Sequence, residues 1–245
     1  MPFIQIEDSI LSFRLRRSLR AKRLHMVVKE EVFEVVAPLK TSNREILAFL
    51  KQYQGWMRKQ VRQKSRTQSV TKMSWPADFL AGEYIPYRGR WLRLNVKFND
   101  RALMECHEDY LTIMVPWRHA FGGLSQYVKK QIWLWYQQEA LNAIKDSIDA
   151  LCPKLGRWPR GYQLKKQKTR WGSCGISGKI YLNWLLILAP VGALEYVVAH
   201  ELCHLFHRNH GKRFWAKVAS CFPEYEQQER WLSKQGSALI SLSSF

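Results

Sequence analysis

Hydrophobic and polar residues alternate along much of the first half of the chain, as they do in half-buried β-strands. The alternation is clear at residues 11–16 and 32–36, so we predict strands there. A longer alternating stretch, residues 84–94, is interrupted by a turn at Gly89, and residues 110–115 form another strand-like run. Short runs separated by turn residues are typical of small antiparallel or mixed sheets. The pattern therefore predicts a β-rich N-terminal region.

Two other segments have apolar residues at the 3.6-residue spacing of amphipathic helices. The first is predicted to begin at Ser42 or Asn43, which are common N-cap residues, and to run toward Arg66. The second is predicted from about Leu124 to Ala150, because Pro153 follows it and proline disfavours a helix interior. Both helices should bury one face.

The order of these elements predicts the fold class and the domain organisation. A chain of 245 residues suits one or two domains with a sizeable core. Strand-rich and helix-rich segments are separated along the chain, which is typical of α+β proteins. We expect a β-rich N-terminal module over residues 1–118 and a compact catalytic module over residues 119–245.

A third helical segment carries the most specific chemistry. It begins near Pro190 and contains His200-Glu201-Leu202-Cys203-His204, an HExxH motif. Positions i and i+4 share one helix face, so His200 and His204 can reach the same metal ion. Glu201 lies beside them and can accept a proton from a metal-activated water. A buried helix that holds histidines for packing is the alternative, but it would not require glutamate at the second position.

Two further histidines compete as the third ligand of a zinc ion. His207 lies about 10 Å along a straight helix from His200, which is too far for both to bind one ion. His210 is followed by Gly211 and preceded by Asn209, residue types that favour the turn at a helix end. We therefore expect one zinc ion per chain, held by three histidines that include His210, with His207 at the rim of the site.

The sequence around the HExxH motif resembles that of a known protein family. It rests on Arg170–Cys174, Ile180–Trp184, Ala189–Pro190, Tyr196–His204, Asn209–His210 and Phe214–Trp215. These segments resemble the YgjP-like family of metal-dependent hydrolases and metallopeptidases, which is related to SprT-like and other small zincins. The resemblance implies a zincin-like catalytic module with His200, His204 and His210 as metal ligands and Glu201 as general base. It is imperfect at Leu185, where a basic residue is common in the family.

The segment before the metal helix is expected to shape the substrate cleft. Residues 179–184 have the composition of a strand, and an edge strand in this part of zincins can pair with an extended substrate. We predict Arg170, Asn183 and Lys168 as substrate-binding residues. Arg170 is suited to stabilise negative charge on a carbonyl or phosphoryl oxygen, although a structural ion pair would also explain it.

The net charge of the chain indicates which classes of molecule it could bind. The chain has 39 Lys and Arg against 20 Asp and Glu, a formal net charge of +19. Such an excess favours polyanions, nucleotides or acidic surfaces as partners, although a basic protein without such a partner remains an alternative. Lys165, Lys166, Lys168 and Arg170 form a basic cluster next to the predicted site.

These observations leave three functions, of which a zinc metallopeptidase acting on a peptide or protein is favoured. A metal-dependent nucleotide (nucleoside triphosphate) phosphohydrolase is the alternative, because the same metal chemistry serves a phosphoanhydride and the basic cluster could hold phosphates. A nucleic-acid-associated module with a structural metal is the third. It does not explain why Glu201 accompanies the histidines.

Cysteine usage and hydropathy suggest the compartment. Five cysteines at irregular spacing do not form a disulfide framework, and we interpret Cys106, Cys152, Cys203 and Cys221 as small core residues. No signal peptide is evident at the N-terminus. Residues 180–199 are apolar, but Asn183 and Pro190 interrupt them, so we expect a cytoplasmic enzyme with no membrane span.

Overall fold

A computed structural model describes most of the chain. The described residues are 2–6, 9–29, 32–57, 75–76, 78–79 and 81–242. They form two compact units, the first drawn from Met1–Lys72, Pro76–Ile85 and Leu92–Lys130, and the second from Met73–Trp75, Pro86–Trp91 and Gln131–Phe245. The modules expected from the sequence, 1–118 and 119–245, remain a prediction.

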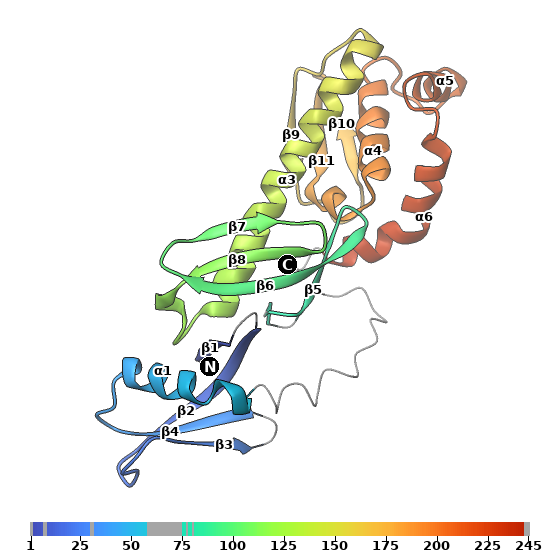
Figure 1. Cartoon of the computed structure of the whole chain (residues 1–245). Coiled ribbons are helices and arrows are strands. Elements are labelled where there is room, and N and C mark those ends of the chain that lie inside the picture. Colours follow the sequence, from blue (N-terminus) through green and yellow to red (C-terminus); the bar gives the residue numbers. More distant parts are fainter. Residues whose placement is uncertain are drawn as a thin grey trace. The chain divides into compact units, whose positions relative to one another are not determined.

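The first unit begins with a sheet and one helix (Figure 1). Their bounds are β1 (Phe3–Ile6), β2 (Ser9–Ser18), β3 (His25–Lys29), β4 (Val32–Pro38) and α1 (Asn43–Gln52). The strand order is β1-β2-β4-β3, with β2 and β4 parallel. Phe13, Val35, Ile46 and Leu50 are fully buried, so the apolar stripe of α1 packs on the sheet.

The start of α1 is as predicted, and its end differs. Ser42 accepts from the Glu45 backbone N–H while the Glu45 carboxylate accepts from the Ser42 backbone N–H, a complete capping box. The helix ends at Gln52, and after a single turn residue, Tyr53, residues 54–57 are helical again. The last part of the predicted stretch, from residue 58 onward, lies outside the described residues.

A second sheet contains β5 (Tyr84–Tyr87), β6 (Arg90–Asn99), β7 (Leu103–Cys106) and β8 (Tyr110–Pro116), in the order β5-β6-β8-β7. Strands β5 and β8 coincide with the predicted runs of alternating hydrophobicity, β6 extends beyond its predicted run to Asn99, and β7 was not predicted. A short 3₁₀ helix, η1 (Trp117–His119), follows. The turn between β5 and β6 requires glycine at position 89, where φ is +78° and a Cβ atom would lie 2.9 Å from Cγ of Pro190.

Helix α3 (Leu124–Leu155) is longer than predicted, because Pro153 lies inside its last turn. Leu151, Cys152 and Leu155 continue its buried stripe, which maintains the helix beyond Ala150. Gly156, with φ of +70°, ends it.

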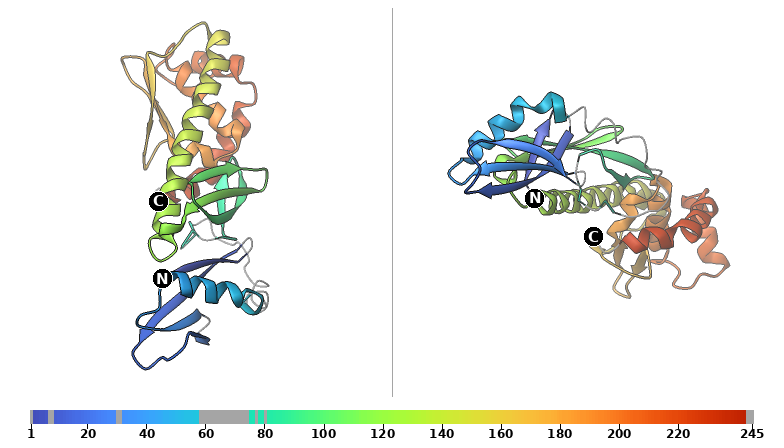
Figure 2. Two further views of the ribbon diagram at one scale, coloured as in Figure 1. Left: turned by 60° about the vertical axis from the view of Figure 1, so that its left-hand side comes forward. Right: turned by 90° about the horizontal axis from the view of Figure 1, so that it is seen from below.

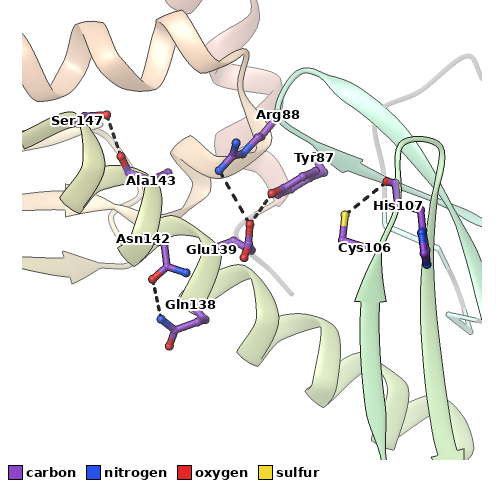
Figure 3. Close-up of polar contacts among 9 residues, drawn as sticks. All are labelled: Tyr87, Arg88, Cys106, His107, Gln138, Glu139, Asn142, Ala143 and Ser147. Carbon is purple, nitrogen blue, oxygen red and sulfur yellow. Dashed lines mark hydrogen bonds and ion pairs between the residues drawn. The ribbon is translucent and has the colours of Figure 1, made fainter. Parts of the chain in front are cut away.

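Contacts of Glu139 attach the β5–β6 turn to α3 within the second unit (Figure 3). The Tyr87 hydroxyl donates to Glu139 Oε2 at 2.5 Å, and the Arg88 guanidinium lies 4.0 Å from the same oxygen. Tyr136, one helical turn before Glu139, donates its hydroxyl to the Pro86 carbonyl at 2.6 Å. The turn that contacts Pro190 is thereby held to the longest helix of the unit.

The remaining part of the second unit combines a small sheet with helices. Their bounds are β9 (Gly161–Lys165), β10 (Gly172–Cys174), β11 (Lys179–Asn183), η2 (Trp184–Leu188), α4 (Val191–Cys203), α5 (Lys212–Cys221) and α6 (Tyr225–Ser241). Helices α3 and α4 run side by side (Figures 1 and 2), and α4 also contacts β10, α5 and α6. The fold class is α+β, as predicted.

Strand order corrects one expectation about the substrate cleft. The order is β10-β11-β9, so the strand at residues 179–183 is central and pairs on both sides. It has no free edge to offer to a substrate. The edge strand that contacts α4 is β10.

Three of the four cysteines predicted to be core residues are buried. These are Cys152, Cys203 and Cys221. The prediction for Cys106 is wrong, because this residue is exposed at the end of β7, a largely exposed strand. Its thiol donates to the neighbouring His107 carbonyl at 3.6 Å (Figure 3). In the part of the chain that the structure describes, no helix is long and apolar enough to cross a bilayer.

Candidate active site

Helix α4 positions the HExxH motif. Pro190 is its N-cap and His204 its C-cap, so the helix ends at the motif and not near Asn209, as the sequence suggested. A tight turn follows, in which the Leu205 N–H donates to the Leu202 carbonyl at 3.0 Å. This early end returns the chain toward the helix and brings His210 back to the motif.

Three imidazole rings converge at the end of α4. His200 Nε2 lies 3.2 Å from His204 Nε2 and 2.9 Å from His210 Nε2. One ligand atom from each of these histidines falls within 4.8 Å of the others, which qualifies the group to hold a metal ion. His210 is exposed, while the other two are partly buried. The cluster therefore keeps one side accessible to solvent, as a catalytic metal site requires.

The second nitrogen of two of these rings has its own partner. His204 Nδ1 donates to the His207 carbonyl at 3.0 Å, and His200 Nδ1 lies 3.5 Å from the Tyr196 hydroxyl. Such contacts orient an imidazole and leave Nε2 free for a metal. His207 thus contributes its backbone carbonyl, and its side chain is outside the cluster.

Burial also favours the protonation state that a metal needs. Burial, reinforced by the neighbouring His204 and His210, lowers the pKa of His200 to about 3. Burial lowers the pKa of His204 as well. Both rings are therefore neutral at physiological pH, and neutral imidazole is the form that binds a metal.

Glu201 is a buried carboxyl group with an unsatisfied oxygen. Its residue is 5% exposed, and Oε2 has no hydrogen-bond partner among the described residues. Burial raises the pKa of Glu201 to about 8, and the Arg170 charge opposes that rise. Buried polar atoms without partners are rare in folded proteins and frequently mark a functional group. Because the Glu201 carboxyl group also lies beside three converging imidazoles, it is the candidate general base.

A glycine lies directly against this carboxyl group. At Gly172 in β10, a Cβ atom would lie 2.6 Å from Glu201 Oε1 and 2.7 Å from its Cγ. Real Cβ atoms are not found this close to other atoms. The backbone of edge strand β10 therefore lies in close contact with the Glu201 carboxyl group.

We expect Gly172→Ala to displace the Glu201 carboxylate and to lower kcat/KM about a hundredfold, since a shift of about 1 Å at a reacting group has an effect of that order. Metal content should be unchanged, because the three histidines are untouched. Peptide cleavage rates and elemental analysis of the purified variant measure the two quantities. Gly175→Ala is the matched control, since its nearest neighbour lies at an ordinary 3.4 Å. Equal rates for both variants would contradict the close approach.

The three predicted substrate-binding residues differ in position. Asn183 is fully buried; its amide donates to the Gln167 carbonyl at 2.8 Å and to the Arg170 carbonyl at 3.3 Å, and its Oδ1 accepts from the Leu185 N–H at 3.2 Å. It cannot contact a substrate, and the expectation is corrected to a structural role in the loop after β9. Arg170 is exposed and acts electrostatically on Glu201, whereas substrate binding by Arg170 and by the exposed Lys168 stays a prediction.

A pocket of about 420 Å³ lies beside the histidines. Its lining consists of Trp171, Gly172, Tyr196, Val197, His200, Glu201, Glu229, Leu232 and Ser233. The sequence analysis did not predict the contribution of α6 to this pocket. Helical spacing from His200 could have indicated Tyr196, which lies one turn earlier. Nothing local in the sequence indicates Glu229.

Comparison with known proteins gives one match. The family model described as the YgjP-like metallopeptidase domain matches residues 22–235. No curated protein and no solved structure matches the chain. Because the match extends over most of the sequence and includes the three histidines and Glu201, the chain belongs to the YgjP-like family, whose domain is that of a metal-dependent hydrolase or peptidase.

Proposed function

We propose that the protein is a zinc metallopeptidase in which His200, His204 and His210 hold the metal and Glu201 is the general base. The observation that carries the proposal is the buried Glu201 carboxyl, with its unpartnered oxygen, next to three converging imidazole nitrogens. Membership of a metallopeptidase family supports the peptide as substrate.

The donor set suits zinc. Three imidazole nitrogens with an accessible fourth side form the ligand arrangement of many catalytic zinc sites. Zinc at this position would supply a Lewis acid that polarises the scissile carbonyl and acidifies water. Neutral His200 and His204 favour its binding, since burial lowers the pKa of both.

The residues of the chain perform the remaining steps. Glu201 takes the proton of the attacking water on its carboxylate and delivers it to the leaving amine, so one group serves first as base and then as acid. Burial raises the pKa of Glu201 to about 8 in the metal-free protein, and the Arg170 charge opposes that rise and so favours the carboxylate. Tyr196 and the His207 carbonyl hold the rings of His200 and His204 in orientation. Edge strand β10 is placed to align an extended peptide by backbone hydrogen bonds.

A substrate screen tests the proposal. Purified protein loaded with zinc is incubated with a proteome-derived peptide mixture and, separately, with nucleoside triphosphates. New peptide ends are read by mass spectrometry and released phosphate by colorimetry. Glu201→Gln serves as the blank in both arms. Zinc-dependent peptide cleavage that is absent from the blank is expected, whereas activity on triphosphates alone would contradict the proposal.

The nucleotide alternative makes its own prediction about the basic cluster. Lys165 lies over the Tyr181 ring at 3.7 Å, while Lys166 and Lys168 are exposed. If triphosphates are substrates, Lys166→Glu with Lys168→Glu should raise their KM by about tenfold or more and weaken its dependence on salt. Metal content should not change. An unaltered KM would remove the main sequence support for phosphate or polyanion binding at this surface.

A further inference from the structure

The pocket beside the histidines is formed by matching faces of two helices. Helix α4 contributes Tyr196, Val197 and the motif residues, and α6 contributes Glu229, Leu232 and Ser233. Positions 229, 232 and 233 share one helix face, as do 196, 197 and 200. The pocket therefore includes His200 and Glu201, the proposed general base, and a side chain next to the cleaved bond would enter it.

Its walls suit a long side chain with an apolar stem. Val197 and Leu232 are buried apolar residues, and the Trp171 indole lies against α6 at Gly236. Gly236 permits this position, because a Cβ there would lie 3.0 Å from Trp171 Nε1. A volume of about 420 Å³ exceeds what a short side chain would fill. Aliphatic methylenes packed along tryptophan and leucine are favourable.

The charge of the pocket is acidic, in contrast with the chain as a whole. No Lys or Arg is among the described residues that line it, and its carboxylates are Glu201 and Glu229. Arg170 offsets the charge of Glu201, so Glu229 supplies the net negative potential. Burial raises the pKa of the Tyr196 phenol on the opposite wall, and the Glu229 carboxylate adds to that rise. A cation between Glu229 and the Tyr196 and Trp171 rings gains ion-pair and cation–π interactions.

We propose that this pocket binds a lysine or arginine side chain of the substrate peptide, adjacent to the cleaved bond, with Glu229 as the specificity-determining residue. The inference rests on the proposed peptidase function and adds its substrate class. The long stem and terminal cation of these two side chains match the apolar walls and the carboxylate at the rim.

The test compares peptides that are blocked at both ends and differ at one position, which is lysine, arginine, norleucine or glutamate. Selectivity is the ratio of kcat/KM for the lysine peptide to that for the norleucine peptide, measured with zinc-loaded protein. Because Glu229 is exposed and its ion pair is screened by solvent, Glu229→Gln should lower the ratio about threefold to fivefold. Glu229→Lys should lower it further and raise the relative rate for the glutamate peptide.

Glu226→Gln is the matched control, because Glu226 lies one turn earlier on the same helix and is absent from the pocket lining. It should keep the wild-type ratio. A ratio that is the same in wild type, Glu229→Gln and Glu229→Lys would overturn the pocket assignment and leave the peptidase proposal intact. The same four peptides with an unblocked amino terminus are a second arm, and cleavage that occurs only in that arm, whatever the varied side chain, would also overturn it. Failure of the wild type to cleave any peptide would instead overturn the proposed function.

Discussion

Replacement of Glu201 by glutamine is expected to abolish most of the hydrolytic activity while the metal remains bound. Proton transfer by a positioned side chain contributes on the order of 10²–10⁴-fold to a rate, and an amide cannot accept the proton of the attacking water. The amide has nearly the same size as the carboxylate, so the close contact with Gly172 is preserved. The proposed metal ligands are other residues, so the zinc content of the zinc-loaded variant should stay at one ion per chain.

Stability provides a second measurement for the same variant. Burial raises the pKa of Glu201 to about 8, which means that the folded state disfavours the carboxylate relative to the unfolded state. Above the unfolded pKa, this destabilises the metal-free protein. Glutamine removes that effect, so the metal-free variant should melt at the wild-type temperature or higher.

A matched acid-to-amide change on the same helix controls for this experiment. Glu195 lies on α4 and lines a different pocket, with Arg88 and Ser147, so Glu195→Gln should retain wild-type turnover. Zinc-loaded variants are compared by kcat on the best peptide from the screen. Near-wild-type turnover of Glu201→Gln would remove Glu201 from the mechanism and leave the metal as the only catalytic element.

The sequence predicted the parts of the site that depend on local spacing. His200 and His204 are four residues apart on a helix, and this separation alone predicts a shared ligand face. The turn around Asn209 and Gly211 predicted that His210 would return to that face, and the three rings converge. A straight helix that continued past residue 204 would separate His207 from His200 by about 10 Å. The helix ends there. His207 lies outside the group of converging imidazoles, and its backbone carbonyl orients His204.

Other parts of the site depend on packing between residues far apart in the chain, which cannot be predicted from a single sequence. Glu229 and Leu232 lie on α6, and only the packing of α6 against α4 brings them to Glu201. Asn183 illustrates the opposite error. A polar residue beside a predicted site suggests a substrate contact, yet it is fully buried and satisfies backbone groups of the neighbouring loops. The strand expected at the sheet edge is central for the same reason, since strand order is a property of the whole sheet.

Removal of the third histidine is expected to have the largest effect on metal binding. Loss of a partner that only orients a ligand typically lowers metal affinity by about 10–100-fold, so loss of a direct ligand in His210→Ala should lower it by more than about 100-fold. The remaining pair, His200 and His204, can still contact the ion but no longer enclose it. Competition with a zinc-sensitive chelator measures the dissociation constant, and elemental analysis measures retention after dialysis.

The decisive comparison is with His207→Ala. The His207 carbonyl, which accepts from His204 Nδ1 at 3.0 Å, belongs to the backbone and survives the substitution. The orientation of His204 is therefore kept, and zinc affinity should remain within about threefold of the wild type, well short of the loss of even an orienting partner. The two variants remove the same chemical group at positions three residues apart. A general effect of losing an imidazole would therefore lower the zinc affinity of both variants equally. Weak binding by His207→Ala together with full binding by His210→Ala would show that the wrong histidine has been assigned to the metal.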